Sequence, residues 1–165
     1  MRVPAALVGL AIGGLGALGA WELAHARTLD DATRRDLARV LVAEADGSRP
    51  DWLAILWVLE HRRQRAHKAG RPRTLRETAR YSALWRSRSP RAREIRALGH
   101  ADPEVPHGPR RARQWEAALR FVDTWAAGAT RDPCPTATHW DRQEPPWPWV
   151  RVGCGPTVNL FGRRP

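Results

Sequence analysis

Residues 53–59 read Leu-Ala-Ile-Leu-Trp-Val-Leu, an unbroken apolar run. Such a run leaves no polar stripe, and a helix that is apolar on every side is buried on every side. Ser48 or Asp51 can cap this helix, Pro50 stands near its first turn, and the basic run 62–65 ends it. We therefore expect a central, buried helix with the other elements packed around it.

Four further helices are predicted from capping residues and helical spacing. Thr28 and Asp31 resemble a capping box, with Asp in place of the usual Glu or Gln, and Thr74 and Glu77 form a clean one. The expected ranges are about 31–45, 74–82, 89–99 and 115–128, and Ser89 is the predicted cap of the helix over 89–99, with Pro90 at its first position.

The stretch after Gly128 lacks helical spacing. It is rich in Pro and Trp, and only Val150 and Val152 suggest a short strand. No internal repeat and no second domain can be found. We expect a mainly α fold with a small irregular lobe at the C-terminus.

The composition points to a globular protein with an anionic partner. The chain has 165 residues, of which 42% are hydrophobic, so wholesale disorder is excluded. The net charge is +11, which suits nucleic acid, phospholipid or an acidic wall polymer. There are nine Trp but only two Phe and one Tyr, and the indole is a flat platform for sugar rings or bases.

The N-terminus has the pattern of an export signal. Residues 3–21 carry no charge, Arg2 precedes them, and Ala24-His25-Ala26 follows them. We expect residues 1–26 to be a signal peptide cleaved after Ala26. Because the apolar run just reaches spanning length, an uncleaved membrane anchor through residues 3–21 is the alternative. In both cases residues 27–165 form one exported domain, which is periplasmic, extracellular or on the outer face of the cytoplasmic membrane.

Export makes the two cysteines informative. A lone pair such as Cys134 and Cys154 usually forms a disulfide in an oxidising compartment. Closing a loop of about 20 residues stabilises the fold by roughly 3 kcal/mol, and the Pro-rich lobe needs such a link. A zinc site would need more ligands than His139 and Asp141 add nearby, so we expect no metal and no cofactor.

One carboxylate stands on an apolar helix face. Leu37, Val40, Leu41 and Glu44 follow the spacing i, i+3, i+4 and i+7. Burial would raise the pKa of Glu44 and keep it protonated near neutral pH, as a general acid requires. The alternative is that Glu44 lies at a frayed helix end, where it reaches solvent or pairs with an arginine.

Several short motifs, in order, resemble the SleB-like cell-wall hydrolases, which include spore cortex-lytic and lytic transglycosylase-like enzymes. Residues 37–45 match a helix that ends in an alanine-flanked Glu. Residues 54–62 match a buried helix that ends in Asn-Arg, where this chain has His61-Arg62. The later matches are Tyr81-Ser82 with Trp85, Asp132-Pro133 with Ala137-Thr138-His139-Trp140, Pro146-Trp147, and Val152-Gly153 with Asn159-Leu160-Phe161. Together they span about residues 36–163.

The resemblance implies a lysozyme-like helical fold and cleavage of the glycan strands of peptidoglycan. The catalytic residue would be Glu44. The substrate-binding residues would be Tyr81, Ser82, Thr138, His139, Trp140 and Asn159. Two positions depart from the family: the second acid found in many relatives is here Ser48, and a late histidine is here Asn159.

A single acid suffices for lytic transglycosylation. It protonates the glycosidic oxygen after N-acetylmuramic acid and then takes the proton of that sugar's 6-hydroxyl group. Hydrolysis would need a second carboxylate, and we interpret Asp46 and Asp51 as surface cap residues. Trp140, Trp147 and Trp149 either stack on sugars or pack under the Pro-rich loop. We interpret Arg62, Arg63 and Arg65 as a solvated helix end, and the alternative is that they contact carboxylates of the cell wall.

The alternative function is a non-enzymatic, basic Trp- and Arg-rich module that binds anionic glycan or nucleic acid. Export and the even spread of arginine along the chain argue against nucleic acid. An enzyme should open a groove with Glu44 at its floor, whereas a binding module should show a continuous basic face with Glu44 paired. We expect a monomer that acts on peptidoglycan, in a bacterial or a phage-lysis setting.

Overall fold

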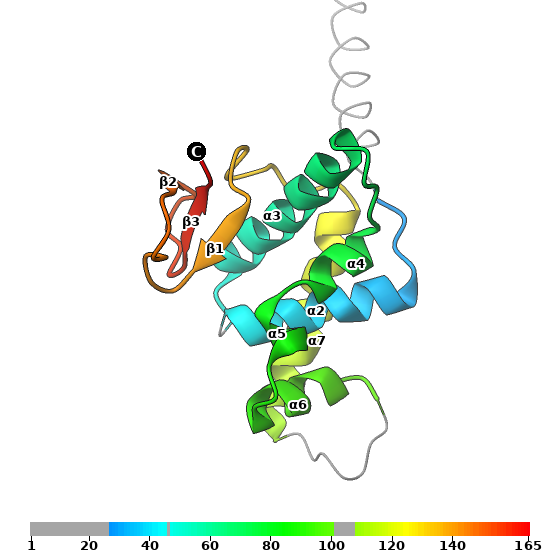
Figure 1. The fold of residues 1–165 in the computed structure, drawn as a ribbon. Helices are drawn as coiled ribbons and strands as arrows, with labels where there is room; N and C mark the ends of the chain where they lie inside the picture. The colour runs from blue at the N-terminus through cyan, green and yellow to red at the C-terminus, as the bar shows by residue number, and fades with distance from the viewer. Residues whose placement is uncertain (1–26, 46, 101–107) are drawn as a thin grey trace, which may run out of the picture.

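The computed structural model describes residues 27–45, 47–100 and 108–165, and within them the fold is mainly helical, as expected (Figure 1). A small three-stranded sheet lies to one side of the helices. The helices of the described part are α2 (Asp31–Glu44), α3 (Arg49–Lys68), α4 (Leu75–Arg80), α5 (Ala83–Arg86), α6 (Pro90–Ala97) and α7 (Pro109–Ala126). The strands are β1 (His139–Asp141), β2 (Val150–Val152) and β3 (Leu160–Arg163).

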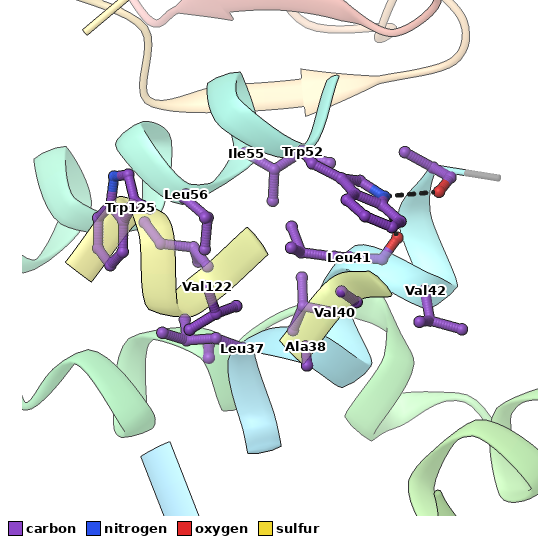
Figure 2. Packing of buried hydrophobic residues seen from close by; sticks show 14 of the residues in the cluster. Leu37, Ala38, Val40, Leu41, Val42, Trp52, Ile55, Leu56, Val122 and Trp125 are labelled. Carbon is purple, nitrogen blue, oxygen red and sulfur yellow. Dashed lines mark hydrogen bonds between the residues drawn. The ribbon is translucent and has the colours of Figure 1, made fainter. Parts of the chain in front are cut away.

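Helix α3 lies at the centre of the core, as its apolar run predicts. Residues 54–59 are all buried, and only Leu53 at the start of the run is partly exposed. Leu37 and Leu41 of α2 and Val122 of α7 pack against this helix (Figure 2). The Trp52 indole N–H donates to the carbonyl oxygens of Leu41 and Ala45, at 3.1 and 2.9 Å. The end of α2 is thereby attached to the start of α3.

The helix caps confirm three predictions and correct one. Ser48 caps α3, Ser89 caps α6, and Thr74 and Glu77 form the predicted capping box of α4. The capping box predicted at Thr28 is wrong. Asp30 caps α2 instead, because its carboxylate accepts from the Thr33 backbone N–H at 2.6 Å and from the Thr33 hydroxyl at 2.9 Å.

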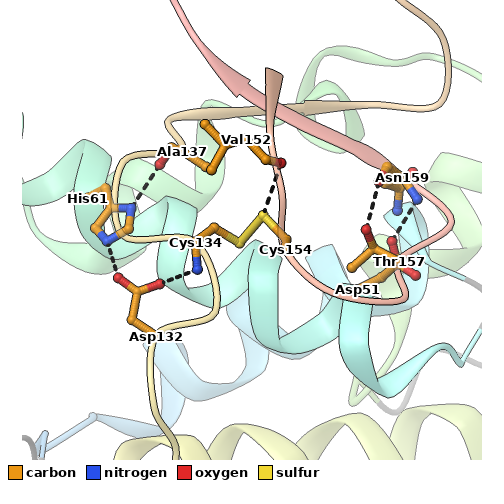
Figure 3. Close-up of a disulfide and its surroundings, with 9 residues drawn as sticks. All are labelled: Asp51, His61, Asp132, Cys134, Ala137, Val152, Cys154, Thr157 and Asn159. Atoms are coloured by element: carbon orange, nitrogen blue, oxygen red, sulfur yellow. Dashed lines mark hydrogen bonds and ion pairs between the residues drawn. A yellow bond between two sulfur atoms is a disulfide. The ribbon is translucent and has the colours of Figure 1, made fainter. Parts of the chain in front are cut away.

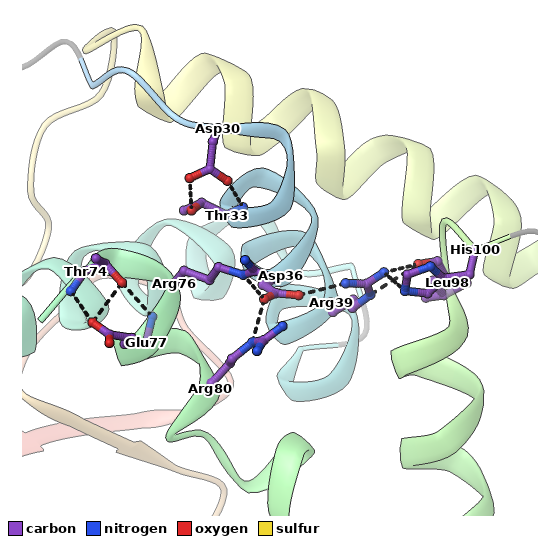
Figure 4. A network of polar contacts seen from close by, with 10 residues as sticks. All are labelled: Asp30, Thr33, Asp36, Arg39, Thr74, Arg76, Glu77, Arg80, Leu98 and His100. Atoms are coloured by element: carbon purple, nitrogen blue, oxygen red, sulfur yellow. Dashed lines mark hydrogen bonds and ion pairs between the residues drawn. The ribbon is translucent and has the colours of Figure 1, made fainter.

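The helix predicted over residues 74–82 is α4, and it ends at Arg80. Ser82 then stands at the N-cap position of an unpredicted single turn, α5, without a side-chain capping hydrogen bond, and the two helices form the α4–α5 segment. A buried carboxylate holds this segment against α2: Asp36 accepts from Arg76 and Arg80 at 2.9 Å each and from Arg39 at 2.7 Å (Figure 4). Although burial raises the pKa of Asp36, the three guanidinium groups outweigh it and lower that pKa.

The C-terminal lobe is more regular than predicted. Its three strands form an antiparallel sheet in the order β1-β3-β2, of which only β2 was expected. Strands of three or four residues are too short to show alternation in sequence. Gly162 lies under the Trp149 ring, and a Cβ there would come within 2.3 Å of that ring. The half-buried Trp149 ring therefore packs against β3.

The disulfide between Cys134 and Cys154 is present, as predicted, and closes a separation of 20 residues within the lobe (Figure 3). A disulfide indicates an oxidising environment. The signal or anchor predicted for residues 1–26 lies outside the described residues. Among the helices that the structure does describe, none combines the length and the apolar character needed to cross a membrane.

Two polar contacts fasten the lobe to α3. The His61 ring nitrogens face two acceptors: Nδ1 lies 2.8 Å from the Ala137 carbonyl oxygen, and Nε2 lies 2.7 Å from the Asp132 carboxylate. Since both acceptors need a proton from the ring, His61 is an imidazolium cation here. Burial lowers the pKa of His61, but these two acceptors raise it by more.

Candidate active site

A pocket of about 390 Å³ lies where the end of α2, the α4–α5 segment and the lobe meet. Six of the seven predicted site residues line it: Glu44, Tyr81, Ser82, His139, Trp140 and Asn159. Thr138 does not line this pocket. It lies in a neighbouring one, with its backbone N–H bonded to the Gly162 carbonyl oxygen at 2.9 Å. Tertiary folding therefore brings together residues that lie far apart in the sequence.

Glu44 is the last residue of α2 and is only partly exposed. The three residues that precede it on the same helix face, Leu37, Val40 and Leu41, are fully buried. Burial raises the pKa of the Glu44 carboxyl group. A hydrogen bond with the Trp140 side chain and the charges of Arg142 and Arg62 act in the opposite direction, while Asp141 adds to the increase. The group is thus inclined to hold a proton and has cations nearby that can stabilise the carboxylate.

Asp51 anchors the backbone next to Glu44. The interpretation of Asp51 as a surface cap residue is wrong, because its side chain is fully buried. Its carboxylate accepts from the backbone N–H group of Val158 at 3.0 Å. It also accepts from that of Asn159 at 2.8 Å (Figure 3). The Asn159 side-chain amide in turn donates to the Glu44 carbonyl oxygen at 3.3 Å. Asn159 therefore holds the end of α2 as well as lining the pocket. Asp46, the other acid considered, lies outside the described residues.

Arg62 belongs to the site, contrary to its interpretation as part of a solvated helix end. Its Nε donates to the Thr138 carbonyl oxygen, and its guanidinium lies 4.5 Å from the centre of the Trp140 ring. Burial lowers the pKa of Arg62 to about 10, and the charge of Glu44 partly opposes this. The sequence did contain a signal for it, because the resembled family ends this helix in Asn-Arg. Arg63 pairs with Glu60 on the same helix, and Arg65 is exposed.

His139 lines both of these neighbouring pockets, and its surroundings favour the neutral form of its ring. Burial lowers its pKa, and the charges of Arg62, Arg164 and Arg65 lower it further. Its Nδ1 lies 3.0 Å from the Thr138 hydroxyl. A neutral imidazole beside a hydroxyl can donate or accept one hydrogen bond from a sugar.

Ser82 lines the pocket, but its hydroxyl oxygen is buried. The residue is 3% exposed, and its Oγ has no hydrogen-bond partner among the described residues. Buried polar groups without a partner are rare. The neighbouring Tyr81 is 56% exposed at the pocket rim, with the Arg73 guanidinium 4.2 Å from its ring centre.

The tryptophans of the lobe divide by exposure. Trp147 is 40% exposed and lines the pocket, which makes its ring the best placed for stacking on a sugar. Trp140 is partly buried and packs against the core. Trp140 therefore serves the interior as well as the pocket, where it contacts Glu44 and Arg62.

Asp141 is the other carboxylate on the wall of the Glu44 pocket, a role that the sequence did not suggest. It is exposed at the end of β1, and its Oδ1 accepts from the Arg142 backbone N–H at 2.7 Å. No cluster of three His, Cys, Asp or Glu side chains that could hold a metal ion occurs in the described part of the chain.

Comparisons of the chain with known protein families, with characterised proteins and with solved structures find no match. The arguments about function below therefore rest on the sequence motifs and on the geometry of this pocket.

Proposed function

We propose that this protein cleaves the glycan strand of peptidoglycan as a lytic transglycosylase, with Glu44 as both general acid and general base. The observation that carries the proposal is a carboxyl group with a raised pKa in a pocket walled by a helical body and a Trp-rich lobe. A raised pKa lets a carboxylic acid keep the proton that it must donate at neutral pH. The helical body with Glu44 at the end of α2 fits the lysozyme-like arrangement that the motifs imply.

The proposed reaction needs one proton that moves twice. Glu44 gives its proton to the glycosidic oxygen as the bond from C1 of N-acetylmuramic acid to that oxygen breaks. The Glu44 carboxylate then takes the proton of the same sugar's 6-hydroxyl group as O6 bonds to C1. Water is not consumed, Glu44 ends protonated, and the product is a 1,6-anhydro sugar. Arg62 and Arg142 would stabilise the transient carboxylate.

The remaining side chains would bind and orient the sugars. The Trp147 ring would stack on a sugar face, and Tyr81 and Ser82 would bond to an acetamido group. His139 and Tyr81 stand on the same wall, and Thr138 would act through His139. A peptidoglycan substrate also requires export, which the disulfide and the N-terminal pattern support.

Hydrolysis is the second candidate reaction, because Asp141 lines the pocket with Glu44 and could be the second carboxylate that was not recognised from the sequence. It would act as the base for an attacking water. A non-enzymatic binding module is less well supported, since Glu44 lines an open pocket, the feature expected of an enzyme.

Digestion of peptidoglycan sacculi, followed by mass spectrometry of the released fragments, tests the proposal. Wild-type protein should release anhydro-muropeptides, whereas reducing ends would assign hydrolysis. Glu44→Gln should lower the release by at least about 10²–10⁴-fold, because Gln fills the same volume but cannot carry the proton. Glu116→Gln, at an exposed site on α7, is the matched control and should stay active. More than a tenth of wild-type activity in Glu44→Gln would refute the role of Glu44.

A further inference from the structure

A second pocket, of about 400 Å³, opens beside the Glu44 pocket and is strongly basic. The two pockets share Arg62, Tyr81 and His139, so they form neighbouring parts of one recess. Three further arginines line the second pocket: Arg65, Arg71 and Arg73. Among the described residues, no Asp or Glu lines it.

These arginines come from two adjoining segments, and their side chains line the same pocket. Arg65 lies in the last turn of α3, whereas Arg71 and Arg73 lie in the turn that leads to α4. All three are exposed, and no ion pair joins Arg65 or Arg71 to an acidic group in the described part of the chain. The Glu77 carboxylate, whose pKa the charge of Arg73 helps to lower, is already engaged with Thr74 in the α4 capping box. Like charges that converge on a recess favour an anion there.

We propose that this basic pocket is a subsite for the carboxylates of the peptidoglycan stem peptide. The inference rests on the proposed function and extends it from the glycan to the peptide. The stem peptide branches from the lactyl group of N-acetylmuramic acid, the sugar whose glycosidic bond Glu44 would cleave. A sugar bound at Glu44 would therefore direct its peptide into an adjoining pocket, and the pocket across Arg62 is the basic one. Guanidinium groups bind carboxylates through paired hydrogen bonds, which suits a peptide with several free carboxylates.

Calorimetric titration of the full chain with the stem tripeptide L-alanyl-D-isoglutamyl-meso-diaminopimelate tests this subsite without requiring any catalysis. The double variant Arg65→Gln/Arg71→Gln removes two charges from the basic pocket and none from the Glu44 pocket. We expect its dissociation constant for the tripeptide to rise by about tenfold or more. Arg113→Gln/Arg120→Gln removes two exposed charges from α7 and should bind as wild type does. Wild-type binding should also weaken as salt is added, which is a check that needs no variant.

The controls separate the possible ligands. The same tripeptide with its carboxylates amidated should not bind, and inorganic phosphate should not displace the tripeptide when both are present at equal concentration. Displacement by phosphate would identify a general anion site and overturn the proposal, as would equal losses in the two double variants. Tripeptide binding that depends on Arg65 and Arg71, with no cleavage of sacculi, would refute the glycosidase and keep the subsite. Cleavage without such binding would refute the subsite alone.

Discussion

At Glu44, the burial that raises the pKa of the carboxyl group also makes its ionised form costly to the folded protein. The carboxylate near the end of α2 is surrounded by the Trp140 indole, Arg62 and Arg142, which moderate that cost without cancelling it. Burying Glu44 therefore lowers the stability of the folded protein slightly while it prepares the carboxyl group to act as a general acid. The loss should be measurable as a dependence of stability on pH.

Glu44→Gln should stabilise the protein at neutral pH and not at acidic pH. The folded-state pKa of Glu44 lies above its unfolded value of about 4.3, so the favourable protonated state is fully populated below that pH. Its contribution is lost as the pH rises through the folded-state pKa. Gln has no such transition. Thermal melts of wild type and variant from about pH 4 upward should show a melting-temperature difference that grows in favour of Gln. A difference that stays constant with pH would contradict the raised pKa.

The element that places Tyr81 and Ser82 is the α4–α5 segment, and the buried Asp36 holds it in place. Two of the three guanidinium groups on Asp36 come from α4, about 40 residues away along the chain. The third, Arg39, also donates to the Leu98 carbonyl oxygen at the end of α6, at 2.7 and 3.2 Å (Figure 4). A single carboxylate therefore joins three helices behind the pocket.

Asp36→Asn should destabilise the fold by about 3–5 kcal/mol, because it leaves the buried Arg39 cation without its counter-charge. Denaturant unfolding followed by tryptophan fluorescence measures the change. Asp31→Asn is the control: the Asp31–Arg35 pair is exposed, so its loss should cost about 1 kcal/mol or less. Equal effects of the two substitutions would show that Asp36 is not a structural anchor.

Trp147 and Trp125 should separate binding from stability. Trp147 is exposed on the pocket wall, so Trp147→Ala should weaken the binding of soluble glycan fragments with little change in melting temperature. Trp125 on α7 is fully buried, and Trp125→Ala should cost about 3–5 kcal/mol through the cavity that it leaves. Calorimetric titration with glycan fragments and thermal melts of both variants provide the two readouts. Unchanged glycan binding by Trp147→Ala would place the sugar platform elsewhere.

For the whole molecule, the pocket depends on how the lobe is attached to the helices. Asp51 at the start of α3 binds the backbone of residues 158 and 159. Farther along α3, His61 pairs with Asp132 and attaches the other side of the lobe to this helix. The disulfide closes the lobe on itself between these two attachments. Rigid positioning of His139 and Trp140 opposite Glu44 follows from all three.

Cys134→Ser/Cys154→Ser should lower the free energy of unfolding by about 3 kcal/mol, as loop closure over this separation predicts. The helical circular dichroism signal, to which α2 and α7 contribute, should persist at low temperature, since the disulfide lies wholly within the lobe. Intact mass spectrometry of the oxidised wild-type protein should show a chain two protons lighter than the reduced one. Free thiols in protein made in an oxidising compartment would refute both the link and the support that it lends to export.

Most of the helices could be predicted from the sequence pattern alone, and the resemblance supplied most of the predicted residues that line the pocket. The apolar run 53–59, the caps at Ser48 and Ser89 and the pairing of the two cysteines are all interactions of near neighbours or of a unique pair, so pattern alone reveals them. The predicted residues around Glu44 also meet in one pocket, apart from Thr138.

Which charged side chains are buried depends on the tertiary structure. From the sequence, Asp51 and Arg62 are interpreted as surface residues and Asp36 is not singled out, because the groups that satisfy them lie 107, 76 and 40 residues away, respectively. The strands β1 and β3 were missed for the same reason: each is too short to be recognised alone and forms by pairing with the other. The free energy of a buried charge depends on partners that folding brings close, and no local pattern records them.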